Sequence, residues 1–171
     1  PGYHTTGRSA AVFMESYGPA QVRSLTRASR RHFESTPGWL SPRAAMFIGR
    51  AEQAAAVDEL ESTLAADGAR ARRLDSAAAL ARVPLLRASA AAHALLDDDA
   101  CDLDGHAIHQ HFLRRVREHG AALRCDAHVT GLEREGALWR VSLAAGPVLR
   151  ATVVVNAAGA WADELAALAG A

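Results

Sequence analysis

Acidic and histidine side chains gather near the middle of the chain, and side chains of these types can bind a metal ion. They are Asp97, Asp98, Asp99, Asp102, Asp104, His106, His109 and His111. A calcium loop of the EF-hand type needs a central glycine and a closing glutamate at set positions, and that order is absent. Zinc needs ligands beyond a pair of histidines three residues apart. We therefore expect a solvated acidic loop followed by polar helix surface, with no metal site.

The turn at residues 156–160, NAAGA, is a second candidate. It follows the consecutive valines Val153 to Val155, which are typical of a strand covered on both faces, as in a parallel sheet. A helix is expected from Trp161. A strand, a small-residue turn and a helix start let backbone N–H groups come close to a phosphate or a ring. Tight packing of a strand against a helix selects the same small residues, so both interpretations stay open.

The elements that position these groups follow from periodicity and end signals. Helices are expected at residues 19–33, 52–66, 75–81 and 105–118, and strands or extended stretches at 44–48, 88–96, 121–129, 139–143 and 148–155. In the first helix Val22, Leu25, Ser29 and Phe33 share one face, and the arginines are expected to form a solvated basic face. Asp102 or Asp104 is expected to cap the helix at 105–118.

Composition excludes several classes of protein. The 171 residues are 50% hydrophobic and 22% charged, and 19 basic residues balance 19 acidic ones, so no positive field attracts nucleic acid. The apolar runs are shorter than a transmembrane helix needs, and no signal segment opens the chain. Cys101 and Cys125 lack CxxC spacing, which favours a reducing compartment. A cytoplasmic protein with no transmembrane segment is expected, and the turn-rich start at Pro1 predicts a fragment of a larger domain.

Three stretches in order carry a resemblance that spans nearly the whole chain. They are HTTGRSAA near the start, DLDGHAIHQHFLRRVREHGAAL at about two-thirds, and VVVNAAGAWADEL near the end. Together they resemble the D-amino-acid oxidase superfamily of FAD-dependent oxidoreductases, which includes glycine oxidase, sarcosine oxidase and D-amino-acid dehydrogenase. The family's GxGxxG turn and ribose-binding acid lie upstream of the first stretch and are absent here.

The resemblance implies a set of cofactor-binding residues and FAD as the cofactor. The first loop is expected to lie along the pyrophosphate and the flavin ring, Val129 to bind the adenine through its backbone, and the second turn to pass under the flavin. The residues are Thr5, Thr6, Gly7, Arg8, Ser9, Ala10, Val129, Ala157, Ala158, Gly159 and Trp161. Hydroxyl groups and free amides can bind phosphate oxygens, and Arg8 can offset their charge. Taken alone, TTGRS is an ordinary capped turn.

The resemblance also implies a fold and an activity. The fold is α/β: part of a Rossmann-like FAD-binding domain of the glutathione-reductase type at residues 1–36 and 101–171, with part of an inserted α+β substrate domain at 37–100. The expected reaction is oxidation of the C–N bond of a D-amino acid or N-substituted glycine, with oxygen or a quinone as the electron acceptor. A 2-hydroxy-acid or glycerol-phosphate dehydrogenase, a non-catalytic nucleotide-binding module and an inactive truncated fragment remain alternatives. No catalytic residue is assigned, since Arg43, Arg50 and Arg87 are candidates only as arginines.

Overall fold

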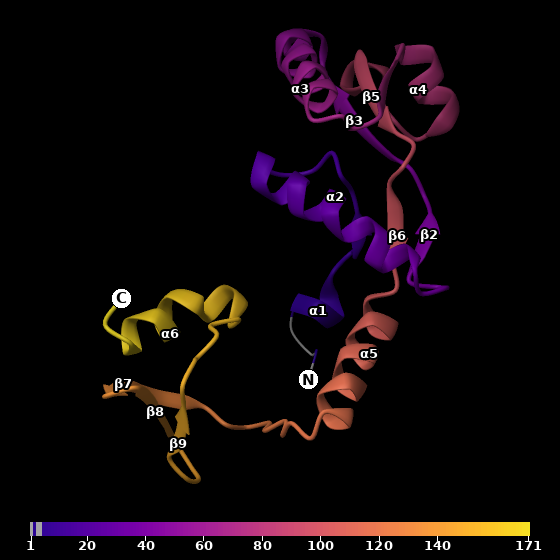
Figure 1. The fold of residues 1–171 in the computed structure, drawn as a ribbon. Helices are drawn as coiled ribbons and strands as arrows, with labels where there is room; N and C mark the ends of the chain where they lie inside the picture. The colour runs from indigo at the N-terminus through magenta and orange to yellow at the C-terminus, as the bar shows by residue number, and fades with distance from the viewer. Residues whose placement is uncertain (1, 3–4) are drawn as a thin grey trace. The chain divides into compact units, whose positions relative to one another are not determined.

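A computed structural model describes residue 2 and residues 5–171, which form two units, Gly2–Arg115 and Val116–Ala171. Figure 1 shows the course of the chain and labels helices and strands where there is room. Those of the first unit are α1 (Thr5–Arg8), β1 (Val12–Phe13), α2 (Ala20–Glu34), β2 (Leu40–Pro42), β3 (Ala45–Gly49), η1 (Ala51–Gln53), α3 (Ala54–Ala66), β4 (Ala71–Leu74), α4 (Ser76–Arg82), η2 (Ala88–Ala90), β5 (His93–Asp97) and β6 (Cys101–Leu103), followed by α5 (Gly105–Glu118). The second unit continues with β7 (Val129–Glu135), β8 (Leu138–Leu143), β9 (Leu149–Ala151), η3 (Gly159–Trp161) and α6 (Ala162–Leu168).

Two antiparallel sheets form in the first unit, in the strand orders β1-β6-β2 and β3-β5-β4. The second sheet encloses an apolar cluster that includes Leu74, Ala79 and Leu96. Leu64 of α3 and Leu95 of β5 are fully buried. Strand β5 leads directly through a short turn into β6, so one continuous stretch of chain belongs to both sheets.

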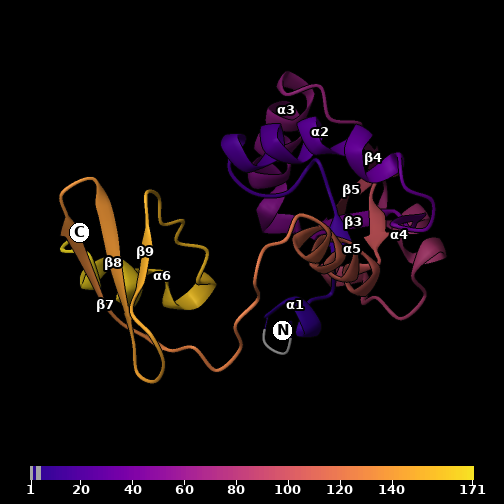
Figure 2. The same ribbon diagram turned by 60° about the horizontal axis from the view of Figure 1, so that its bottom comes forward.

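The second unit is a three-stranded antiparallel sheet in the order β7-β8-β9, with α6 packed beside β7. Figure 2 shows these strands side by side. A bulge interrupts the pairing between Val129 and Gly131. Because β7 is an edge strand, one side of its backbone has no neighbouring strand among the described residues.

The helices expected from sequence are confirmed, and two of them have identifiable start signals. The Asp104 carboxylate accepts a hydrogen bond from the N–H of Ala107 (2.8 Å) and caps α5, whereas Asp102 pairs with Arg43. The Asp75 carboxylate likewise caps α4 by accepting from Ala78 N–H (2.8 Å). An N-cap acceptor satisfies one of the backbone donors that a helix start leaves without an intrahelical partner.

Three strand expectations are wrong in whole or in part. Residues 121–128 form no strand, and Asp126 adopts a left-handed backbone (φ 54°) that interrupts an extended chain. Residues 88–90 form the 3₁₀ turn η2 rather than extended chain. Strand β9 ends at Ala151, so the following valines are irregular. A valine run is buried where other elements cover both faces of its strand, and here Val153 and Val155 lie outside any strand and are exposed.

The expectation of a solvated basic face on α2 is also wrong for three of its arginines. Arg23 is buried, donates to the carbonyl of Gly18, and pairs with Asp67 at the end of α3. Arg27 and Arg30 both pair with Glu15. A guanidinium can be turned inward when carboxylates and carbonyls satisfy its donors, as they do for Arg23 and Arg30, which connect α2 to the segment before it and to the end of α3. The Nε and Nη2 of Arg27 are buried without a hydrogen-bond partner among the described residues.

Candidate functional site

The first expected site loop, residues 6–10, is exposed along its whole length in the first unit. Thr5 to Arg8 form the single helical turn α1, and the chain then extends toward β1. The Ser9 hydroxyl oxygen accepts a hydrogen bond from Ala11 N–H (3.0 Å), and Ala11 takes a left-handed backbone (φ 46°). The side chain of Ser9 thus holds the bend between α1 and β1 while the residues before it face outward.

Gly7 occupies a position where the chain passes close to itself. A Cβ atom added at Gly7 would lie 2.2 Å from the carbonyl oxygen of Gly2. Backbone atoms cannot yield as the tip of a flexible side chain can, so only glycine fits this turn without moving the chain. The glycine in the middle of TTGRS therefore has a steric reason within the loop itself.

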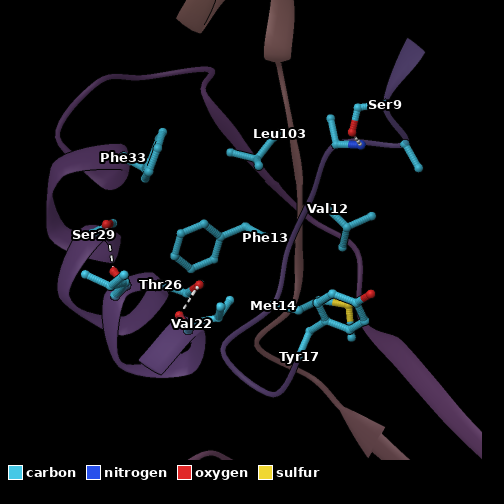
Figure 3. Close-up of a pocket in the computed structure, with 13 residues that line it drawn as sticks. Ser9, Val12, Phe13, Met14, Tyr17, Val22, Thr26, Ser29, Phe33 and Leu103 are labelled. Atoms are coloured by element: carbon cyan, nitrogen blue, oxygen red, sulfur yellow. Dashed lines mark hydrogen bonds between the residues drawn. The ribbon is translucent and has the colours of Figure 1, made fainter. Parts of the chain in front are cut away.

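A pocket of about 680 Å³ opens beside the loop, and Figure 3 shows its lining. Ser9 and Ala10 contribute to one wall, Phe13 of β1 and Leu103 of β6 to another, and α2 to a third. The helix face expected from sequence lines this wall, because Val22, Leu25, Ser29 and Phe33 all border the pocket. Thr26 and Ser29 donate their hydroxyl protons to carbonyls of their own helix. The surface offered beside the loop is consequently mostly apolar.

The second expected turn, which precedes α6, is held by a residue that the sequence analysis did not single out. The Asn156 Nδ2 donates to the carbonyl oxygen of Ala162 (2.8 Å), and its Oδ1 accepts from Ala158 N–H (3.2 Å). Gly159 has a left-handed backbone (φ 59°) and open space around its Cα hydrogens. Asparagine bonding to the backbone two residues on is a recurrent turn signal, and it was available in the letters NAAGA.

The side chains of this turn present a small, open surface. Ala157 and Gly159 are exposed, Ala158 is half-buried, and Trp161 keeps 48% of its surface exposed. Trp161 closes the 3₁₀ turn that leads into α6. Ala157, Gly159 and Trp161 are thus accessible on the surface of their own unit. The preceding valines depart from the expected buried strand, with Val153 70% and Val155 80% exposed.

Val129 begins the edge strand β7 in the same unit. The carbonyl of the preceding residue, His128, accepts from Ala144 N–H (2.8 Å) on the β8 side. Successive residues of a strand turn their N–H and C=O groups to opposite sides. The backbone groups of Val129 therefore face the open edge, where a flat ring with a donor and an acceptor can pair with them.

The other residues considered as ligands have ordinary partners. Arg43 pairs with Asp102 and Arg50 with Glu52, in both cases on the surface. No group of three or more His, Cys, Asp or Glu side chains that could hold a metal ion occurs in the part of the chain that the structure describes. The carboxylates of Asp97 and Asp98 instead accept hydrogen bonds from Ser16 and Arg72, and the backbone carbonyl of Asp99 accepts from Arg30.

A family model described as "FAD dependent oxidoreductase" (DAO) matches residues 1–171, the whole chain. The chain therefore belongs to this family of FAD-dependent oxidoreductases, and the resemblance drawn from its three stretches is confirmed. The loop, the turn and the edge strand lie in that FAD-dependent framework, and FAD is confirmed as the family's cofactor.

Solved structures match the fold over nearly the whole chain. L-proline dehydrogenase from P. horikoshii matches with a TM-score of 0.80 and 22% identity, over 98% of this chain and 46% of its own. The dithionite-reduced L-α-glycerophosphate oxidase of Mycoplasma pneumoniae, with FAD bound, matches with a TM-score of 0.84 and 15% identity, over 99% of this chain and 48% of its own. Glycine oxidase from Geobacillus kaustophilus matches with a TM-score of 0.76 and 20% identity, over 99% of this chain and 49% of its own.

These likenesses confirm the expected α/β fold class, with part of an FAD-binding domain. The chain spans about half the length of each of these structures. In the described part of the chain, none of the helices has both the length and the apolar character required to cross a bilayer.

The chemistry of the described residues fits a flavin dinucleotide. The expected contacts from Thr6 onward are exposed or half-buried positions, and apart from the indole of Trp161 they offer a small side chain, a hydroxyl, a guanidinium or a free backbone edge. Local structure keeps these groups accessible in three places. The Ser9 hydrogen bond holds the first bend, the Asn156 hydrogen bond holds the second turn, and Val129 lies on an edge strand. The donors suit phosphate oxygens and the edge of an adenine, and the small residues suit a flat ring.

Proposed function

We propose that these residues form part of the flavin site of an enzyme that oxidises the C–N bond of a D-amino acid or an N-substituted glycine to an imine. The observation that carries the proposal is the family match over all 171 residues. Two of the similar structures are named for amino-acid substrates, glycine and L-proline, and this favours C–N over C–O oxidation. The L-α-glycerophosphate oxidase keeps C–O oxidation as the second candidate.

The residues of this chain bind and orient. Bound FAD supplies the hydride acceptor for such a reaction. In the proposal Thr5, Thr6, Arg8 and Ser9 bind pyrophosphate oxygens, while Gly7 and Ala10 let the backbone come close to the ring system. The backbone of Val129 pairs with the adenine. Ala157, Ala158 and Gly159 pass under the flavin without holding it off, and Trp161 borders it. Each group contributes binding or orientation rather than proton transfer.

The proposed division of labour keeps residues 1–36 and 101–171 in the cofactor-binding part and 37–100 in the substrate-binding part. The sheet β3-β5-β4 supports it, because its strands all come from residues 45–97 and enclose a core of their own. Oxygen or a quinone is the proposed electron acceptor. The proposed cytoplasmic location is consistent with Cys101 and Cys125, which are both free thiols.

An absorption spectrum of the polypeptide expressed from its complete reading frame tests the proposal. We expect flavin bands that bleach when D-amino acids or N-methylglycine are added without oxygen. If only 2-hydroxy acids or glycerol 3-phosphate bleach the flavin, the enzyme oxidises a C–O bond and the proposed C–N oxidation is wrong. Flavin that none of these compounds bleaches would favour a non-catalytic nucleotide-binding module, and a protein with no flavin would overturn the proposal.

A further inference from the structure

A buried polar contact joins two segments that lie 81 residues apart in the chain. The hydroxyl of Ser16 donates to the carboxylate Oδ2 of Asp97, and both residues are only 3% exposed. The other carboxylate oxygen of Asp97 accepts from Asp99 N–H (3.0 Å). Burying a carboxylate is costly unless its oxygens are hydrogen-bonded, so the position of Ser16 is strongly tied to that of Asp97.

Arg30 of α2 contacts both of the segments that Ser16 and Asp97 join, and we call this group of contacts the junction. Its Nε pairs with Glu15, the residue before Ser16, and its Nη2 donates to the carbonyl of Asp99 (2.9 Å). The guanidinium carbon also lies 4.9 Å from the centre of the Phe13 ring in β1. Burial acts to lower the pKa of Arg30, but the hydrogen bond and charge of Glu15 outweigh it and raise the pKa above its ordinary value. The cation is therefore permanent.

Strand β1 needs such an anchor because it is short. It contains only Val12 and Phe13, which pair with Asp102 and Cys101 of β6. At its start the carbonyl of Ala11 accepts from Leu103 N–H (2.7 Å), and at its end the contacts of Glu15 and Ser16 begin. Two residues of ladder resist sliding weakly, so the register of β1 depends on the groups at both ends. The exposed loop at residues 6–10 leads directly into β1, so the register of β1 sets where the loop ends.

We propose that Asp97 and Arg30 are positioning residues, which hold β1 in register and thereby place the loop at residues 6–10 against the flavin dinucleotide. The inference rests on the proposed function, because the loop must first be part of a flavin site. In the proposed division of the chain Asp97 ends a strand of the substrate-binding part, while Ser16 belongs to the cofactor-binding part. The contact would thus fix the loop relative to the sheet β3-β5-β4.

The test measures the rate at which FAD leaves the complete polypeptide, by the rise in free flavin fluorescence after dilution, together with the melting temperature. Asp97→Ala is expected to speed FAD release about tenfold, because it leaves the Ser16 hydroxyl and the Asp99 N–H without their acceptor. Asp97→Asn is expected to behave close to wild type. Its amide oxygen still accepts from Asp99, and its NH₂ can donate to the Ser16 oxygen.

Two control variants separate positioning from general loss of stability. Leu64→Ala removes a fully buried side chain of α3 that takes no part in the junction, and Arg73→Ala breaks an exposed pair with Asp58 and Glu61. Both are expected to keep the wild-type release rate, whatever their melting temperature. Should Asp97→Ala not fold, Ser16→Ala replaces it, with the same expected acceleration.

The outcomes are distinguishable from those of the proposed function. A wild-type protein without flavin would overturn both proposals. A wild-type protein that holds flavin, with Asp97→Ala or Ser16→Ala releasing it no faster than Leu64→Ala at equal loss of melting temperature, would overturn the positioning role alone. Fast release by Asp97→Ala, with recovery in Asp97→Asn, is the result that supports it.

Discussion

The side-chain amide of Asn156 donates to the carbonyl oxygen of Ala162 across the turn that precedes α6. The same side chain accepts from the N–H of Ala158, so one residue ties the start of the turn to its middle and its end. Asn156 is the only asparagine of the chain. Its two contacts explain how a turn of alanine and glycine, which have little side chain to pack, keeps a defined shape.

Asn156→Ala is expected to weaken FAD binding in the complete polypeptide. Each lost side-chain hydrogen bond is worth about 1 kcal/mol, and the freed turn no longer presents Ala157 to Gly159 in one conformation. Asn156→Asp keeps the acceptor for Ala158 but loses the donor to Ala162, so an intermediate effect is expected. Titration of apoprotein with FAD measures both.

Glu164→Gln provides the control for the Asn156 variants, because it changes an exposed residue in the first turn of α6, the helix that follows the Asn156 turn. An unchanged FAD affinity in Asn156→Ala would show that the turn either keeps its shape without the side chain or does not contact the cofactor.

Gly7→Ala is expected to disrupt the first loop. The added Cβ would meet the Gly2 carbonyl oxygen at 2.2 Å, so the chain has to move apart. We expect faster FAD release with little change in melting temperature, because the loop is exposed and contributes little to the core. Gly105→Ala is the matched control, since its Cβ would find only ordinary contacts at 3.8 and 4.0 Å beside the same loop. Equal release rates in the two variants would contradict the steric argument.

Val129→Ala and Val129→Pro separate the side chain of Val129 from its backbone. If the adenine pairs with the N–H and C=O, alanine leaves both groups in place and the FAD affinity is expected to stay close to wild type. Proline removes the N–H, so a drop of about fivefold to tenfold is expected, the worth of one hydrogen bond. A large loss in Val129→Ala, measured by the same titration, would contradict recognition through the backbone.

At low pH the Arg72–Asp98 ion pair is expected to stop stabilising the fold. The hydrogen bond from Arg72 holds the pKa of the Asp98 carboxyl below its ordinary value of 3.8. A carboxyl with a lowered pKa stabilises the fold above pH 3.8, and that stability is lost as the pH falls through the lower folded-state pKa. The melting temperatures of wild type and Arg72→Ala should therefore differ slightly near pH 6 and converge toward pH 2. A gap that stays constant would argue against the pair.

Local signals predicted the helices and the two turns at residues 6–10 and 156–160. The helix at 105–118 coincides with α5, and that at 19–33 agrees with α2 to within one residue, because each has an apolar stripe and end signals. The bends at Ser9 and Asn156 use turn residues that act within a few positions of themselves. Such features are written in neighbouring letters and need no knowledge of distant segments.

Long-range features could not be predicted in this way. The valines after Thr152 have the composition of a buried strand, but burial depends on distant segments that cover both faces of the strand, and no local pattern reveals these. Arg23 and Arg30 looked like surface charges until their partners Asp67 and Glu15 were known. The contact between Ser16 and Asp97 joins two polar residues that lie 81 positions apart, and nothing near either residue in the sequence indicates the other. The sequence contained the groups, and only the fold brings them together.

The chain contains no lysine, so the ion pairs of the described residues all use arginine as the cation. A guanidinium does not lose its proton in a protein, whereas an ammonium does so as the solution becomes alkaline. Arg30, whose pKa is raised above its ordinary value by Glu15, consequently keeps its charge at any basic pH the fold meets. The same composition removes every side-chain amine from the surface, so reagents that label or acetylate lysine have no side chain to attack.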